Sequence, residues 1–180
     1  MEKIPERSFF PVDRAIATAV LKILLLFLTQ GGDAMKNHEY RTLVLDDEEN
    51  IRFSLATFIE ARGHEVVTAS EPLSCPLYGE DACSCPSDEQ CGDFAIIDQN
   101  MPRMTGLEFV RKKLNSGCKA APENHLLISA HLTDDELAQA RKLGIPCMLK
   151  PVRLEQVSAW LAAVEKKVPT TRRLKIFRNR

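Results

Sequence analysis

The sequence predicts a doubly wound α/β fold, in which one parallel sheet is covered by helices on both faces. Short apolar runs of strand length alternate with longer segments whose apolar residues recur at helical spacing, which is typical of such folds. Several of these runs also stop abruptly at acidic or polar residues. With 180 residues, 44% of them apolar and 27% charged, the chain can form one ordinary core with appendages, and its composition excludes collagen, coiled coils and wholly disordered chains.

The first two strands are expected on either side of one helix. Residues 42–45 form a continuous apolar run, which indicates a strand buried on both faces, and residues 65–69 form the second strand candidate. Asn50 is expected to cap the helix between them, and Gly63 to end it. The apolar face of this helix consists of Ile51, Leu55, Phe58 and Ile59.

The second half of the predicted domain repeats the pattern. A strand over residues 94–97 ends at Asp98, and helical periodicity follows over residues 105–114. A strand over residues 126–128 is followed by a helix that Thr133 opens, and residues 146–149 form the fifth strand candidate. The last helix has an apolar face made of Leu154, Val157, Leu161 and Val164. With right-handed crossovers, the strand order 2-1-3-4-5 would place the first and third strands side by side.

Polar residues at the carboxyl ends of these strands are expected to meet at one edge of the sheet. Asp46 and Asp47 follow the first strand and Asp98 ends the third, so three carboxylates would share a shallow pocket. Ser129 and Lys150, at the ends of strands four and five, would line the same edge. Mg²⁺ suits such a pocket because it prefers oxygen ligands and keeps several waters. A carboxylate beside Mg²⁺ and a lysine ammonium can attack phosphorus, which would leave an acyl phosphate on an aspartate.

Four motifs in this chain together resemble the receiver domain of bacterial two-component response regulators. They are LVLDDEEN at residues 43–50, FAIIDQNMPRMTG at 94–106, LISAH at 127–131 and LKP at 149–151. The resemblance spans residues 41–164 and implies a (βα)5 flavodoxin-like three-layer sandwich. It also implies that Asp98 is the phosphoacceptor, which takes a phosphoryl group from a phosphohistidine.

The resemblance implies roles for the other residues at these strand ends as well. Asp47 matches the direct metal ligand, Asp46 matches the acid that holds metal-bound water, and the backbone carbonyl of Asn100 matches the remaining protein ligand. Ser129 matches the hydroxyl residue that follows the phosphoryl group, and Lys150 matches the lysine that pairs with it.

Residues near the fifth strand include one match and one departure. The Lys150-Pro151 bond matches the position at which the family usually has a cis peptide. Receiver domains usually carry a tyrosine or phenylalanine three residues before the lysine, and here that position is Cys147. A cysteine cannot present a ring to partners, so the favoured interpretation is a small buried core residue, with redox sensing as the alternative.

The largest departure from the family lies at residues 70–92, where a regular helix and loop are usual. Three prolines and the lack of helical periodicity predict that this helix is shortened or replaced by an insert. Four of the six cysteines fall here, Cys75, Cys83, Cys85 and Cys91, whereas Cys118 and Cys147 stand alone in the sequence. Four thiolates could hold Zn²⁺ or an iron-sulfur cluster, and disulfides or free thiols in a variable loop stay open as alternatives.

Both ends of the chain are expected to lie outside the receiver domain, which we place at residues 35–165. The apolar run over residues 15–28 is shorter than the roughly 20 residues of a spanning helix. The favoured interpretation of residues 1–34 is that translation naturally starts at Met35, and a secretory signal or an amphipathic anchor stays open. Residues 166–180 are a basic tail, which we expect to be solvated, including Arg172.

The expected function is that of a stand-alone cytoplasmic phosphoacceptor switch rather than an enzyme. A histidine kinase or phosphotransfer protein would supply the phosphoryl group, and an unidentified downstream protein would bind the phosphorylated form. Nucleic-acid binding is not expected, because an acidic body with a short basic tail presents no continuous cationic face. Membrane contact is expected only if residues 1–34 belong to the native protein.

Two alternative functions remain. One is a metal- or redox-sensing module built on Cys75, Cys83, Cys85 and Cys91. The other is a Mg²⁺-dependent phosphatase with an aspartyl-phosphate intermediate. For that second alternative, the sequence Asp98-Gln99-Asn100 lacks the second acid that such enzymes use as general acid.

Overall fold

The computed structural model describes residues 39–75 and 89–175 of the protein. Its main sheet is parallel and contains β1 (Arg41–Leu45), β2 (Glu65–Ala69), β4 (Phe94–Asp98), β5 (His125–Ser129) and β6 (Cys147–Leu149). The strand order is β2-β1-β4-β5-β6, which is the predicted order once the short extra strand β3 is set aside. The predicted doubly wound α/β class is therefore confirmed.

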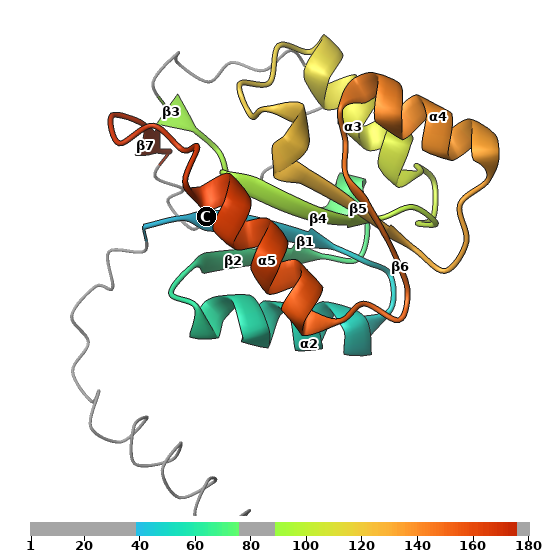
Figure 1. Ribbon diagram of the computed structural model, residues 1–180, viewed down its shortest axis with the longest axis horizontal. Coiled ribbons are helices and arrows are strands. Elements are labelled where there is room, and N and C mark those ends of the chain that lie inside the picture. The colour runs from blue at the N-terminus through green and yellow to red at the C-terminus, as the bar shows by residue number, and fades with distance from the viewer. Residues whose placement is uncertain (1–38, 76–88, 176–180) are drawn as a thin grey trace, which may run out of the picture. The chain divides into compact units, whose positions relative to one another are not determined.

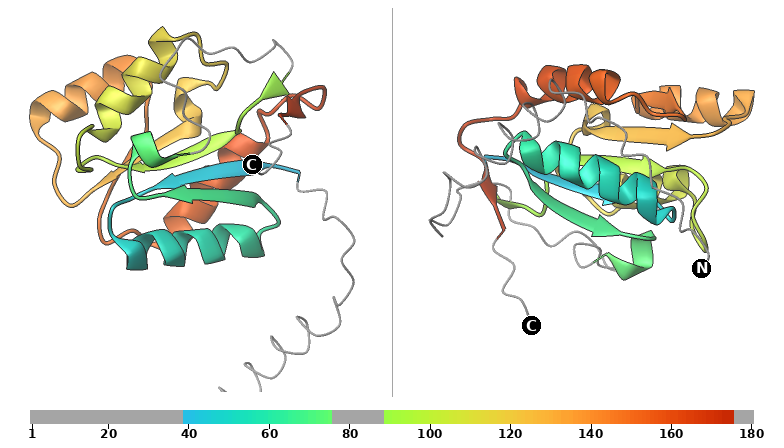
Figure 2. Two further views of the ribbon diagram at one scale, coloured as in Figure 1. Left: turned by 180° about the vertical axis from the view of Figure 1, so that it is seen from behind. Right: turned by 90° about the horizontal axis from the view of Figure 1, so that it is seen from below.

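Helices cover both faces of this sheet (Figures 1 and 2). On one face, α2 (Glu49–Ala61) and α5 (Leu154–Glu165) pack against a core cluster that includes Val44 and Ile96. On the other face, α3 (Gly106–Asn115) and α4 (Asp134–Leu143) pack against a cluster that includes Leu45 and Ile97. Alternate residues of one strand point to opposite faces, so the continuous apolar runs of β1 and β4 supply both cores.

The N-terminal caps of α3 and α4 agree with the sequence prediction, whereas that of α2 does not. Thr105 and Thr133 each form a capping box with a glutamate three residues later, at the starts of α3 and α4. The prediction that Asn50 caps α2 is wrong, because the helix begins at Glu49 and Glu48 occupies the N-cap position without a side-chain cap. The chain turns early there because the Glu48 amide donates to Asp46 Oδ1 at 2.9 Å.

The segment over residues 70–92 contains two short described elements. These are the 3₁₀ turn η1 (Pro72–Ser74) and the two-residue strand β3 (Glu89–Gln90). No α-helix occurs in residues 70–75 or 89–92, which are the described parts of this segment. Residues 76–88, with Cys83 and Cys85, lie outside the described part of the chain, as do residues 1–34.

The described part of the tail contacts the amino-end edge of the main sheet. Beyond α5, β7 (Arg173–Leu174) pairs in parallel with β3. Arg172 Nη2 donates to Asp93 Oδ2 at 2.6 Å, and the side chains of Arg172 and Asp93 are 13% and 0% exposed. The prediction of a solvated tail is therefore wrong for Arg172, whose partner lies 79 positions away in the sequence.

The described helices also include the 3₁₀ turn η2 (Pro122–Asn124), which precedes β5. Within residues 39–75 and 89–175, no helix combines the length and the apolar character that membrane crossing requires.

Candidate functional site

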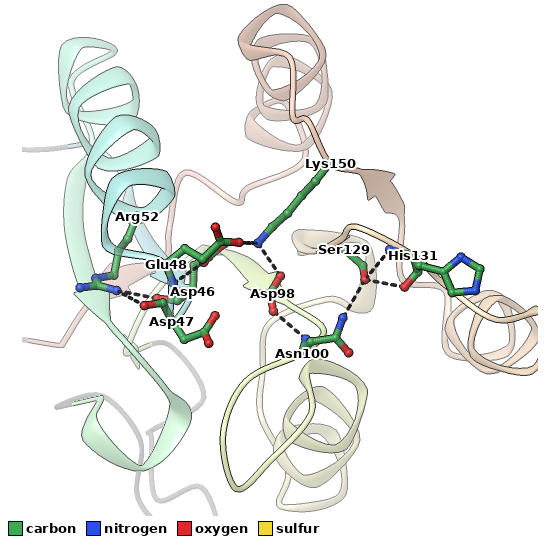
Figure 3. A network of polar contacts seen from close by, with 9 residues as sticks. All are labelled: Asp46, Asp47, Glu48, Arg52, Asp98, Asn100, Ser129, His131 and Lys150. Atoms are coloured by element: carbon green, nitrogen blue, oxygen red, sulfur yellow. Dashed lines mark hydrogen bonds and ion pairs between the residues drawn. The ribbon is translucent and has the colours of Figure 1, made fainter.

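Four strands of the main sheet end at the polar residues that the sequence singled out. Asp46 directly follows β1, Asp98 and Ser129 end β4 and β5, and Lys150 directly follows β6. β1 and β4 are neighbours, with Leu45 paired to Ile97, so Asp46 and Asp98 come from adjacent positions in the sheet. Figure 3 shows these side chains around a common centre at the carboxyl edge.

The ammonium group of Lys150 connects three carboxylates. Its Nζ lies 2.8 Å from Asp98 Oδ1, 3.1 Å from Asp46 Oδ2 and 3.0 Å from Glu48 Oε1. Asp46 and Asp98 are buried, whereas Glu48 is largely exposed. The two buried carboxylates at this edge thus share one cation, Lys150, which directly follows β6.

Burial and charge act in opposite directions on this cluster. Burial alone would lower the pKa of Lys150, but its contacts with the carboxylates of Asp98, Glu48 and Asp46 outweigh burial and raise that pKa. Burial raises the pKa of Asp46, and its contacts with Lys150 and the Glu48 amide offset part of the effect. These contacts favour the charged form of Lys150.

The second oxygen of Asp98 and the end of β5 are joined through Asn100. The Asn100 amide donates to Asp98 Oδ2 at 2.6 Å, and Asn100 Nδ2 donates to Ser129 Oγ at 3.2 Å. Ser129 Oγ in turn donates to the backbone oxygen of His131 at 2.6 Å. The hydroxyl predicted to follow the phosphoryl group is therefore hydrogen-bonded to its own loop, close to the phosphoacceptor candidate.

The donor atoms of Asp46 and Asp47 suit a hard cation. Asp46 Oδ2 is buried and accepts no hydrogen bond, although it forms the ion pair with Lys150. Asp47 is exposed, and its carboxylate has no hydrogen bond or ion pair with the described residues, while Arg52 Nη1 donates to the Asp46 carbonyl at 2.6 Å. Two carboxylates and a carbonyl such as that of Asn100 are donors that Mg²⁺ accepts.

The carboxylates are nevertheless not assembled as a metal cage. Within residues 39–75 and 89–175, no group of three or more histidine, cysteine, aspartate or glutamate side chains is arranged to hold a metal ion. At the carboxyl edge, Lys150 Nζ contacts Asp98 and Asp46 together. Two of the three expected carboxylates, Asp46 and Asp98, thus lie within 3.1 Å of one lysine nitrogen.

Two residues near this cluster also matter: Cys147, the first residue of β6, and Pro151, which follows Lys150. The Lys150-Pro151 peptide bond is cis, as the sequence predicted. Cys147 is half-buried and packs against the α3/α4 core, and burial raises the pKa of its thiol. These observations support the interpretation of Cys147 as a small core residue.

Sequence reasoning missed two contacts of the site. Glu48 pairs with Lys150, although the sequence reading assigned it no role beyond the acidic run that follows β1. Arg52, one turn into α2, holds the carbonyl of Asp46 and has no motif that distinguishes it from a solvated arginine.

The chain is similar in sequence to two curated bacterial proteins, and no family model matches it. A response regulator receiver protein of Anaeromyxobacter is 30% identical over 120 residues, which are 65% of this chain and 45% of that protein. The CAI-1 autoinducer sensor kinase/phosphatase CqsS of Vibrio cholerae is 35% identical over 79 residues, which are 44% of this chain and 10% of that protein. The chain therefore spans less than half the length of these relatives.

Solved receiver structures match the fold over nearly their whole length. The chemotaxis response regulator CheY4 of Vibrio cholerae is 26% identical with a TM-score of 0.55, and the match covers 69% of this chain and 98% of that one. A response regulator receiver domain from Clostridium thermocellum is 23% identical with a TM-score of 0.54, covering 71% of this chain and 95% of that one.

Proposed function

Because this chain contains a response regulator receiver domain, we propose that it accepts a phosphoryl group on Asp98 from a phosphohistidine. The observation that carries this proposal is the position of Lys150 Nζ, within 3.1 Å of both Asp98 and Asp46 at the carboxyl edge. The donor would be a histidine kinase or a phosphotransfer protein. The output would be a contact with a downstream protein.

The proposed reaction needs one nucleophile and charge neutralisation around it. An Asp98 carboxylate oxygen attacks phosphorus, the phosphorus–oxygen bond forms, and the phosphorus–nitrogen bond to the donor histidine breaks. The Asn100 amide holds Asp98 Oδ2, which fixes the orientation of the carboxylate. Lys150 neutralises charge on the transferred group.

Mg²⁺ fits the donor atoms at this edge and is the proposed cofactor. Asp46, Asp47, Asp98 and the carbonyl of Asn100 would hold it, and when bound it would supply positive charge facing the phosphoryl oxygens. Neither Zn²⁺ nor an iron-sulfur cluster is part of this proposal, since Cys75 and Cys91 belong to no metal-holding group within the described residues.

The proposed switch acts through the loop between β5 and α4. Ser129 Oγ now donates to the His131 carbonyl, and a phosphoryl group on Asp98 would offer it a stronger, charged acceptor. Exchange of that bond would move residues 130–133 and the start of α4, and hydrolysis would reverse the change. Cys147 has no ring to turn inward, so in this proposal the loop and α4 carry the signal.

The proposed location is the cytoplasm.

The direct test is phosphorylation of the full chain with acetyl phosphate and Mg²⁺, followed by intact-mass measurement. The unmodified sequence should gain one phosphoryl group, and D98N should gain none. D134N, which removes an exposed acid at the start of α4, serves as the matched control and should be labelled normally. Equal labelling of D98N would refute the assignment, and labelling that persists after removal of divalent ions would refute the role of Mg²⁺.

A further inference from the structure

The side chain of Gln99 lies between the first turns of two helices. Gln99 directly follows Asp98 and is only 2% exposed. Its Nε2 donates to Glu136 Oε1 at 2.7 Å, and its Oε1 accepts from the Leu107 amide at 3.1 Å. Glu136 belongs to the first turn of α4 and Leu107 to the first turn of α3, two helices that lie side by side (Figure 1). One carboxamide therefore joins the residue after the phosphoacceptor candidate to both helices.

The orientation of this carboxamide follows from the chemistry of its partners. A backbone amide can only donate and a carboxylate accepts, so Oε1 must face Leu107 and Nε2 must face Glu136. The backbone of Gln99 is held as well, because its amide donates to the Ile128 carbonyl at 2.8 Å and its carbonyl accepts from the Gly106 amide at 3.0 Å. The side chain is thus oriented by contacts with the sheet and with both helices.

A second capping box in the chain shows that the contact with Gln99 is not part of helix capping. Glu136 Oε2 accepts from the amide and the hydroxyl of Thr133, at 2.7 and 2.8 Å, which forms the box of α4. In α3, Glu108 Oε2 accepts the same two bonds from Thr105, and within the described residues its carboxylate accepts no further hydrogen bond. Glu108 is exposed, whereas Glu136 is half-buried. The second oxygen of Glu136 therefore serves the contact with Gln99 alone.

This contact also holds one end of the loop between β5 and α4. Ser129, where the loop begins, accepts a hydrogen bond from Asn100 Nδ2 (Figure 3). Thr133, where the loop ends, is held by Glu136, which Gln99 contacts. The two residues that follow β4 thus hold the loop at both of its ends. Movement of the loop must lengthen or break at least one of these contacts.

We propose that Gln99 is a positioning residue that holds α4 in the place it occupies before phosphorylation. The inference rests on the proposed function, in which Ser129 turns to the phosphoryl group and residues 130–133 move. Thr133 would then carry Glu136 with it, and the contact between Glu136 and Gln99 would be lost. Because this contact stabilises only the unphosphorylated arrangement, it sets the equilibrium between the two positions of α4.

Loss of the contact alone should therefore shift α4 towards its phosphorylated position. One hydrogen bond corresponds to a change of roughly threefold to tenfold in this equilibrium constant. Binding at Asp98 and the position of α4 are linked, so a phosphoryl analogue should bind more tightly by up to the same factor. A side chain that merely filled space would leave this affinity unchanged.

The test follows amide hydrogen exchange over residues 130–143 of the full chain by mass spectrometry, with and without beryllium trifluoride and Mg²⁺. Beryllium trifluoride stands in for the phosphoryl group and should speed exchange over these residues in the unmodified chain. Q99M has a side chain of similar length without polar hydrogens, and it should exchange faster there even without the analogue. Its half-saturating concentration of the analogue should fall roughly threefold to tenfold.

Two further variants examine the same contact from the side of the helices. E136Q turns an amide donor toward Gln99 while keeping an oxygen for Thr133, so it should act like Q99M. It also tests the inference should Q99M fail to fold. E108Q makes the same change in the box of α3 and is the matched control, which should behave as the unmodified chain.

An exchange of donor and acceptor separates this role from general packing. Q99E alone would place two carboxylates together and should speed exchange over residues 130–143. In Q99E/E136Q the donor and the acceptor change places, while an oxygen still faces the Leu107 amide. Exchange in this double variant should return to that of the unmodified chain.

The outcomes distinguish this inference from the proposed function. If Q99M and E136Q behaved like E108Q, or if Q99E/E136Q exchanged as fast as Q99E, Gln99 would not position α4, whereas phosphorylation of Asp98 would be unaffected. An unmodified chain that neither gains mass from acetyl phosphate nor responds to beryllium trifluoride would instead refute the proposed function, and the inference with it.

Discussion

At the scale of single residues, Lys150 determines whether the acids of the carboxyl edge can be buried. Asp46 and Asp98 are 0% and 2% exposed, and a carboxylate removed from water without a partner costs several kcal/mol. Lys150 contacts both, while its side chain is itself only 12% exposed. The same ammonium thus stabilises the folded chain and contacts the carboxylate of the proposed phosphoacceptor.

Replacing Lys150 by alanine should lower the rate of phosphorylation by acetyl phosphate roughly 10²–10³-fold, the usual cost of one preorganised charge in an active site. Initial rates of mass gain would measure it. K142A removes an exposed cation from α4 and should keep the rate of the unmodified chain. A K150A rate within twofold of that control would show that the ammonium does not act on the transferred group.

The residues of the site that could be predicted from sequence are those at which an apolar run stops. Asp46, Asp98 and Lys150 each follow or end such a run, and the parallel sheet then brings them together. Glu48 and Arg52 could not be predicted, because their partners depend on how α2 leaves β1. The DDEE run contains four acids in a row, and the sequence does not indicate which of their carboxylates will contact Lys150.

At the scale of elements, Gly106 sets the approach of α3 to β4. Its amide donates to the Gln99 carbonyl at 3.0 Å. A Cβ atom at this position would lie 2.6 Å from the carbonyl oxygen of Asp98 and 2.6 Å from Leu127 Cδ1. The helix can begin this close to the phosphoacceptor candidate only because the residue has no side chain.

The substitution G106A should therefore destabilise the fold by about 1–3 kcal/mol, the usual cost of overpacking, because α3 must move away from β4. Urea denaturation would measure the change. G92A is the matched control, since a Cβ there meets its nearest atom, the Arg41 carbonyl oxygen, at 3.7 Å, an ordinary contact. Equal stabilities of the two variants would contradict this account.

Most element positions could be predicted, and the exceptions have a physical reason. The five main strands and the helices α3, α4 and α5 lie within one or two residues of the sequence expectation, because buried strands and amphipathic helices have distinct apolar periods. β3 and β7 contain two residues each, which is too short for any period. Their pairing depends on the path of the chain after α5, which brings residues 173–174 beside residues 89–90.

At the scale of the whole molecule, a polar network closes the amino edge of the sheet. The Arg41 amide donates to Asp93 Oδ2 at 2.8 Å, and Arg172 Nη2 donates to the same oxygen. Arg172 also lies over the ring of Tyr40, 5.4 Å from its centroid. Segments from the start, middle and end of the described chain thus meet at one buried carboxylate, which no local sequence pattern predicts.

The substitution R172M should destabilise the protein by about 3–5 kcal/mol, because it removes one partner of a buried ion pair and leaves the Asp93 carboxylate poorly compensated. Thermal and urea denaturation would both report the loss. K166M removes an exposed cation of the same tail and should leave stability nearly unchanged. If R172M were as stable as K166M, the ion pair between Arg172 and Asp93 would not contribute to stability.

Stability should also fall in mild acid because two histidines are buried. Burial lowers the pKa of His64, and Arg62 lowers it further, although Glu165 and Asp93 act in the opposite direction. Burial likewise lowers the pKa of His125. Below about pH 6.5 the unfolded chain therefore binds protons that the folded chain does not, so stability is full above that pH and falls as the pH decreases.

Urea denaturation at about pH 7.5 and about pH 5.5 would measure this difference, which is at most about 1.4 kcal/mol per pH unit for each histidine. H64Q should reduce the pH dependence, because it removes one of the two buried imidazoles. A stability independent of pH over this range would contradict the prediction.

The intrinsic fluorescence of Trp160 can report on the position of α5. It is the only tryptophan, its ring lies edge-on to Phe94 at 6.2 Å, and its indole nitrogen donates to the Glu123 carbonyl at 3.2 Å. The near-ultraviolet emission of the unlabelled protein therefore arises at the seam between α5 and the sheet. Any change that moves α5 away from the sheet would expose the indole to water and shift its fluorescence emission to longer wavelength. No attached dye would be needed to follow it.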